Sequence, residues 1–203
     1  TSRTIGPQAS ISTKYVSTRG TGKPVGFFEA FSNGLAPDGG LYFPDQFPRF
    51  SEDELMALHG ASLPEVAYRV LAKWFGDEIE DDALRQIAAD AQNFPIPLRP
   101  VGGIHVMELF HGPTLAFKDV ALQLLGRLFE HFLSRSEDHL TIVGATSGDT
   151  GSAAIDAVAG RERIDVFMLH PEGRVSDVQR RQMTTVLSPN VHNIAIGGSF
   201  DDA

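Results

Sequence analysis

The stretch Val143-Gly-Ala-Thr-Ser-Gly-Asp-Thr-Gly-Ser152 decides the fold, because in it a short apolar strand runs through a glycine-rich loop into a helix. Strands and helices alternate on both sides of this stretch. We expect strands at 104–110, 141–145, 164–169 and 191–196, and helices at 116–134, 152–160 and 176–187. Such alternation is typical of a parallel sheet with right-handed crossovers and helices over both faces. The sequence therefore predicts an α/β fold for this half of the chain.

The half that precedes residue 94 is mainly helical. Ser51 and Glu54 have the spacing of a capping box, and Ser62 followed by Pro64 begins a second helix. A third helix, roughly 80–92, places on one side Leu84, Ile87, Ala88 and Ala91. The proline-rich segment 94–100 cannot continue a helix and is typical of a linker. We therefore expect a mainly helical α+β domain at 1–93 and a parallel-sheet domain at 94–203.

The composition argues against several classes of function. The 203 residues carry 26 acidic and 17 basic side chains, and the net charge of −9 argues against nucleic-acid binding. Cysteine is absent and the seven histidines show no metal-binding spacing, so we expect neither a thiol nucleophile nor a metal site. No apolar run approaches the ~18 residues of a membrane span, and residues 1–10 lack the apolar core of a secretory signal. We expect a cytoplasmic protein without membrane or nucleic-acid partners.

The first segment that carries chemistry is His111-Gly-Pro-Thr-Leu-Ala-Phe-Lys-Asp119. The helix that follows has one broad apolar arc, opposite a polar side made of Asp119, Gln123, Arg127 and Glu130. Lys118 falls inside the apolar arc and in the first turn, where the helix dipole opposes positive charge. Desolvation by the surrounding leucines and phenylalanines adds to that effect, so a neutral or imine-bound amine suits the position better than an ammonium ion. The alternative is that Lys118 threads its methylenes along the apolar face and keeps its amine in water.

The second segment is the glycine-rich loop itself. Its three glycines let the backbone approach a ligand closely, and the first N–H groups of the following helix favour an oxyanion. The hydroxyls that could assist belong to Thr146, Ser147 and Thr150. The loop is neither a P-loop nor G-x-G-x-x-G nor G-x-S-x-G. The alternative interpretation is a strand–turn–helix junction with capping side chains, and Asp149 would compete with an anion for the same N–H groups.

Taken together, several runs of this sequence resemble the threonine synthase family, pyridoxal-phosphate enzymes of the tryptophan-synthase-β-like fold (fold type II). The runs are residues 17–20, 34–42, 108–119, 145–151, 182–185 and 198–202. They occur along nearly the whole chain and in order, and the run that ends in Phe117-Lys118-Asp119 is specific to the family. The resemblance implies an N-terminal domain followed by the first part of the cofactor-binding domain.

The resemblance also implies a role for each candidate site residue. Lys118 would form the Schiff base with pyridoxal 5'-phosphate and then act as general acid and base, while Phe117 and Asp149 would contact the cofactor. The substrate would be O-phospho-L-homoserine, converted with water into L-threonine and phosphate. The residues expected to bind this substrate are His111, Thr114, Thr146, Ser147, Gly148 and Thr150.

Members of the family are about twice as long as this chain. Their second half supplies the loop for the cofactor phosphate and most contacts to the substrate phosphate, so we expect a truncated enzyme that cannot complete the reaction alone. Two other hypotheses stay open. One is a catalytically inactive fragment that serves as a binding or interaction module, and the other is a different amino-acid enzyme of this fold, such as a dehydratase. The run around Lys118 disfavours the dehydratase.

Overall fold

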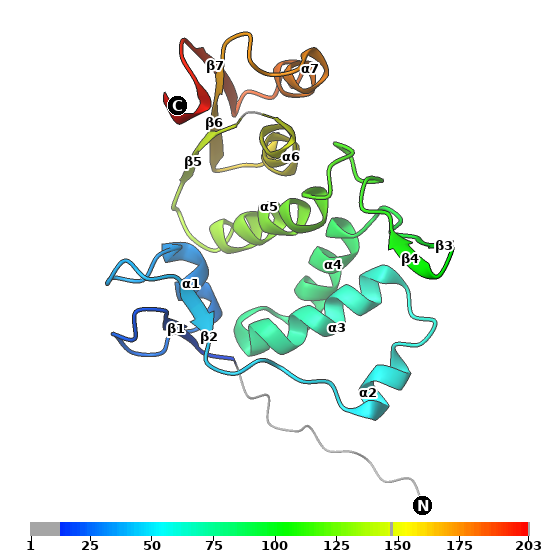
Figure 1. The fold of residues 1–203 in the computed structure, drawn as a ribbon. Coiled ribbons are helices and arrows are strands. Elements are labelled where there is room, and N and C mark those ends of the chain that lie inside the picture. Colours follow the sequence, from blue (N-terminus) through cyan, green and yellow to red (C-terminus); the bar gives the residue numbers. More distant parts are fainter. Residues whose placement is uncertain (1–12, 147, 203) are drawn as a thin grey trace, which may run out of the picture. The chain divides into compact units, whose positions relative to one another are not determined.

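The computed structural model describes residues 13–146 and 148–202 (Figure 1). The described residues form two compact units, of which one ends at Asp90 and the other begins at Ala91. Each unit has its own internal packing. The domain boundary at 93/94 that we expect from the sequence stays a prediction.

The first unit combines helices with one small antiparallel sheet. Its elements are β1 (Tyr15–Ser17), α1 (Phe27–Asn33), β2 (Tyr42–Pro44), α2 (Glu52–Ala57), α3 (Leu63–Phe75), the 3-10 turn η1 (Gly76–Glu78) and α4 (Asp81–Ala91). β1 pairs with β2 so that Tyr15 lies opposite Pro44. The Tyr15 hydroxyl donates to the carbonyl oxygen of Trp74 at 3.1 Å, which ties the sheet to the end of α3.

The helix ends of this unit confirm the capping pattern. Ser51 accepts from the Glu54 N–H, and the Glu54 carboxylate accepts from the Ser51 N–H, which completes the capping box of α2. The Ser62 hydroxyl accepts from the Glu65 N–H at the start of α3. The apolar side expected for the third helix is the buried side of α4, where Leu84, Ile87, Ala88 and Ala91 are all at most 7% exposed.

The second unit begins with a hairpin that corrects two expectations. β3 (Leu98–Val101) and β4 (Ile104–Met107) pair antiparallel through a two-residue turn, in which Gly102 has φ +59°. Gly102 allows such a tight turn because its φ is positive. The expected strand at 104–110 therefore pairs with β3 and does not join the parallel sheet. The segment 94–100, expected to be a linker, is also partly a strand, because its residues 98–100 belong to β3.

The parallel sheet itself is confirmed, with the strand order β5-β6-β7. Its strands are β5 (Leu140–Ala145), β6 (Ile164–Pro171) and β7 (Val191–Ile196), and its helices are α5 (Asp119–Leu133), α6 (Asp149–Val158) and α7 (Asp177–Thr184), followed by the 3-10 turn η2 (Phe200–Asp202). Val143 lies in register with Phe167, and Phe167 with His192. The strands and helices expected from the sequence are therefore present, with ends shifted by a few residues.

The helices pack on one face of this sheet. The core lies between them and the strands, and its fully buried members are Ile155, Ala157, Val158, Ile164, Val166, Met168 and Met183. The opposite face carries Val143 and Ile194, which are 70% and 41% exposed. The expectation of helices over both faces is therefore wrong for the described residues of this unit.

The polar side of α5 is also not where the sequence places it. Asp119 and Gln123 are 0% and 7% exposed, although the helical pattern puts both on the solvent side. They are buried because α6 lies against that side: the Gln123 side-chain amide donates to the Asp156 carboxylate at 2.6 Å. A partner from another helix has satisfied a polar group that the pattern alone would expose.

Candidate active site

Lys118 stands at the start of α5, as its N-cap residue. Its Nζ lies 2.9 Å from Asp149 Oδ1, and the side chain is 25% exposed. Nζ also lies 4.4 Å from the ring centroid of its neighbour Phe117, which is itself 59% exposed. The amine therefore lies beside a carboxylate and the aromatic ring of Phe117. The expected desolvation among leucines and phenylalanines stays a prediction.

Asp149 comes from the loop that follows β5. It is the first residue of α6, and its side chain is 43% exposed. The strand places the loop, and the helix that begins at Asp149 directs the carboxylate towards Lys118, 31 residues away in the chain. The structure thus brings together the two segments that the sequence analysis singled out.

The hydroxyl of Thr146 holds the glycine-rich loop in shape. It accepts from the N–H groups of Gly148 and Gly151, at 3.2 and 3.0 Å, and donates to the carbonyl oxygen of Gly148. Thr146 is 3% exposed, so its hydroxyl serves the loop itself. Gly148 is the N-cap residue of α6. Thr150, the residue after Asp149, is exposed. Ser147 lies outside the described residues.

His111 and Thr114 lie in the segment between β4 and α5. His111 Nε2 lies 2.7 Å from Glu108 Oε2, and its ring centroid lies 4.6 Å from that of Phe110. Thr114 uses both its N–H and its hydroxyl to donate to Asp119, at 2.9 and 2.7 Å. The structure therefore gives Thr114 an internal bond where we expected a substrate contact.

Three residues around this site were not among the candidates. Glu108 orients His111, Asp119 holds Thr114, and Gln182 of α7 donates to the Thr114 carbonyl oxygen at 3.1 Å. All three lie in runs that carry the family resemblance, so their position in those runs was the available signal. The spacing of residues in the sequence could not reveal these contacts, because the partners Gln182 and Thr114 are 68 residues apart.

A second cluster joins two other runs in the first unit. The Asp38 carboxylate accepts from the Ser17 hydroxyl at 2.6 Å, from the Thr21 hydroxyl, and from the Gly40 N–H at 2.9 Å. These hydrogen bonds, with that of Ser17 the largest cause, hold the pKa of Asp38 well below its usual range. Arg19 donates to the Asp38 carbonyl oxygen at 2.9 Å. The runs at 17–20 and 34–42 therefore form one hydrogen-bonded loop pair.

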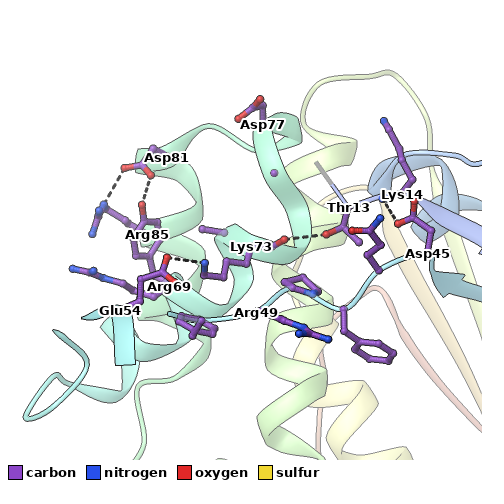
Figure 2. Close-up of a pocket in the computed structure, with 17 residues that line it drawn as sticks. Thr13, Lys14, Asp45, Arg49, Glu54, Arg69, Lys73, Asp77, Asp81 and Arg85 are labelled. Carbon is purple, nitrogen blue, oxygen red and sulfur yellow. Dashed lines mark hydrogen bonds and ion pairs between the residues drawn. The ribbon is translucent and has the colours of Figure 1, made fainter. Parts of the chain in front are cut away.

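The first unit also has a cavity of about 1280 Å³, shown in Figure 2, and none of the candidate site residues lines it. Two of the cationic side chains that line it are paired with carboxylates of the same lining: Lys73 with Glu54 at 2.7 Å, and Arg85 with Asp81 at 3.0 Å. The lining holds five cationic and four acidic side chains, so the cavity offers little net charge to a ligand. It does not compete with the Lys118 site as the candidate for chemistry.

Metal-binding clusters and membrane-spanning helices are both absent from the described residues. No group of three or more histidine or acidic side chains could hold a metal ion within the part of the chain that the structure describes. None of the described helices is long and apolar enough to cross a membrane.

Comparison with known proteins connects this geometry to one family. Residues 14–92 match the family model described as "Threonine synthase N terminus". The threonine synthase of Pseudomonas aeruginosa is 48% identical over 93% of this chain, and that of Schizosaccharomyces pombe is 46% identical over 95%. A crystal structure of pyridoxal-phosphate-bound threonine synthase from Brucella melitensis matches 94% of this chain with a TM-score of 0.90 and 49% identity. The chain spans only 40–42% of the length of these relatives.

Proposed function

We propose, from the similarity of this chain to threonine synthases, that it supplies the N-terminal part of a pyridoxal-phosphate-dependent lyase. The proposed reaction converts O-phospho-L-homoserine and water into L-threonine and phosphate. The observation that carries the proposal is the 2.9 Å contact between Lys118 Nζ and Asp149 Oδ1. That contact puts a primary amine, the group with which an aldehyde cofactor reacts, beside the glycine-rich start of α6.

The residues around the amine suit a pyridoxal ring. Phe117 is 59% exposed beside Lys118 and offers an aromatic face, and Asp149 offers a carboxylate for a polar group of the ring. We propose that Lys118 attaches the cofactor and that Phe117 and Asp149 contact it. When bound, pyridoxal phosphate would supply the electron sink that makes the protons on the substrate's amino carbon and on the carbon next to it removable.

Lys118 is the residue to which we assign proton transfer. A primary amine held at the start of a helix can accept a proton from a substrate carbon and return it to a neighbouring carbon. Asp149 supports that role because its carboxylate lies within hydrogen-bond distance of the amine and holds the side chain in one direction. Lys118 is thus the catalytic residue of the proposal.

The substrate carboxylate is assigned to the start of α6. N–H groups at the beginning of a helix have no partner within it and favour anions, and α6 is ten residues long. His111, held by Glu108, is the polar ring in the segment before α5 that we assign to the substrate. The full set that we propose for the substrate is His111, Thr114, Thr146, Ser147, Gly148 and Thr150. Of these, Thr146 and Thr114 would act mainly by shaping the backbone around the ligand.

The remaining parts of the proposal concern the whole enzyme. Because the relatives are more than twice as long as this chain, we propose that the contacts to the two phosphate groups come from the part of their sequence that it lacks, and that these 203 residues do not complete the reaction alone. The net charge of −9 supports small-molecule substrates and no nucleic-acid partner. We place the enzyme in the cytoplasm, where its small-molecule substrate would be made.

A spectroscopic titration with pyridoxal phosphate tests the proposal. The wild-type chain should gain the absorbance band of a lysine-bound cofactor, and Lys118→Ala should not. Lys23→Ala, at an exposed position of the first unit, is the matched control and should keep the band. An equal band in Lys118→Ala would contradict the proposal and favour a non-catalytic binding module. In a full-length enzyme that carries this segment, Lys118→Ala should abolish threonine formation.

A further inference from the structure

The run 182–185, at the end of α7, carries part of the family resemblance, yet no step of the proposed function uses it. α7 is a short, polar helix of eight residues, and Met183 is its only fully buried residue among those described. If the helix only covered the sheet, its other side chains would face solvent and make no specific contacts. The contacts that its glutamines make point to a more specific role.

α7 packs directly on the glycine-rich loop. A β-carbon on Gly151 would lie 2.8 Å from Met183 Sδ and 2.3 Å from Thr146 Cγ2, so only a glycine admits this approach. A β-carbon on Gly148 would lie 3.1 Å from Gln179 Nε2, which is also tighter than ordinary contact. The backbone around Asp149 is therefore shaped against the side chains of α7.

The same helix also holds the segment that leads to Lys118. Gln182 Nε2 donates to the Thr114 carbonyl oxygen at 3.1 Å. Thr114 in turn donates its N–H and its hydroxyl to Asp119, at 2.9 and 2.7 Å. Asp119 is fully buried and is bonded in the chain to Lys118, and a β-carbon on Gly112 would lie 2.5 Å from its Oδ2. A continuous path of hydrogen bonds thus runs from α7 to the residue next to the amine.

We propose that Gln182, Thr114 and Asp119 form a clamp that positions the Lys118 amine against the loop of Asp149. Gln182 and Asp119 are positioning residues: Gln182 holds the Thr114 carbonyl oxygen, Thr114 donates to Asp119, and Asp119 is the chain neighbour of Lys118. A carboxylate buried with two donors has a fixed direction, because leaving either donor unpaired in the interior is unfavourable. The clamp rests on the proposed function in one respect, which is that Lys118 is the residue to be positioned.

Hydrogen exchange tests the clamp without any cofactor. In Gln182→Ala the amide exchange of the segment 111–117 should rise about tenfold, the change in equilibrium that the loss of one hydrogen bond typically produces. Asp119→Asn and Thr114→Val, which remove other bonds of the clamp, should raise exchange in the same segment. Arg181→Ala, at an exposed position of the same helix, is the control and should leave it unchanged. A uniform rise that includes β6 would mean a general loss of stability and would overturn the clamp.

The rate of cofactor capture provides the second readout. Gln182→Ala should slow the growth of the lysine-bound absorbance band several-fold, while the final extent of modification at saturation stays that of the wild type. If the wild type forms no band, the proposed function fails and the exchange experiment still decides on the clamp. If the wild type forms the band and Gln182→Ala forms it at the same rate with unchanged exchange at 111–117, the clamp is contradicted.

Discussion

Gly126 of α5 and Ala157 of α6 approach so closely that a β-carbon on Gly126 would lie 2.2 Å from the Ala157 carbonyl oxygen. The two helices that carry Lys118 and Asp149 at their starts therefore meet backbone to backbone. Because the obstructing atom belongs to the main chain, it cannot swing aside as a flexible side chain can. The two helices can pack at this distance only because residue 126 is a glycine and has no β-carbon.

Gly126→Ala should destabilise the fold by about 1–3 kcal/mol, the range typical of overpacking at a tight contact. The measurement is the free energy of unfolding from urea titration. Gly103→Ala is the matched control, because a β-carbon there meets nothing within 4 Å and the residue has no positive φ. A Gly126→Ala variant as stable as Gly103→Ala would contradict the close contact.

Asn190 connects the turn between α6 and β6 to the start of β7. Its Nδ2 donates to the carbonyl oxygens of Val158 and Ile164, at 2.9 and 2.8 Å, and its Oδ1 accepts from the Gly160 N–H. Asn190→Asp would replace the donor by a carboxylate oxygen that faces two carbonyls. We expect a loss of about 2 kcal/mol or more in the free energy of unfolding at pH 7, because acceptors are left unpaired and repelled. A loss below about 0.5 kcal/mol would argue that these bonds contribute nothing.

Asp38 makes the stability of the first unit depend on pH. Its pKa is lowered in the folded state, chiefly by the Ser17 hydroxyl and then by Thr21 and the Gly40 N–H. A carboxyl of this kind stabilises the fold fully above its unfolded pKa of about 3.9, and that stabilisation is lost as the pH falls from there towards the lowered folded value. Urea unfolding at pH 5 and pH 2.5 should show a larger decrease for the wild type than for Asp38→Asn.

The control for that comparison is Asp77→Asn, at an exposed position of the same unit, which should keep the pH dependence of the wild type. Equal decreases in the wild type and in Asp38→Asn would show that the hydrogen bonds of Asp38 are not linked to folding.

The ion pair between Lys118 and Asp149 should matter little for stability. Its two side chains are 25% and 43% exposed, and exposed pairs typically contribute about 1 kcal/mol or less. A double-mutant cycle with Lys118→Met and Asp149→Asn, measured by urea unfolding, should therefore give a coupling of at most about 1 kcal/mol. A coupling of about 3 kcal/mol or more would mean that the ion pair contributes strongly to the stability of the fold, which would contradict this expectation.

Local signals explain what the sequence could predict. Ser51, Ser62 and Ser176 each cap a helix that was expected to begin there, because a cap bonds only to the next turn. The strands of the parallel sheet were also expected, since buried strands are short apolar runs between turn signals. The alternation of strands and helices predicted the α/β class, and the family resemblance then specified the tryptophan-synthase-β-like fold, which spacing alone could not do.

Partners distant in the chain explain what the sequence could not predict. The hairpin of β3 and β4 was missed because Pro100 made its first strand look like a linker, although proline is tolerated in an exposed edge strand. The burial of Asp119 and the carboxylate beside Lys118 depend on Thr114 and Asp149, which no periodicity within α5 indicates.

The most direct measurement is the site at which pyridoxal phosphate becomes attached. The wild-type chain is incubated with the cofactor, reduced with borohydride, digested, and analysed by mass spectrometry. The account predicts one modified residue, Lys118, at close to one cofactor per chain. Modification spread over Lys14, Lys23 and Lys73, with Lys118 unmodified, would contradict it.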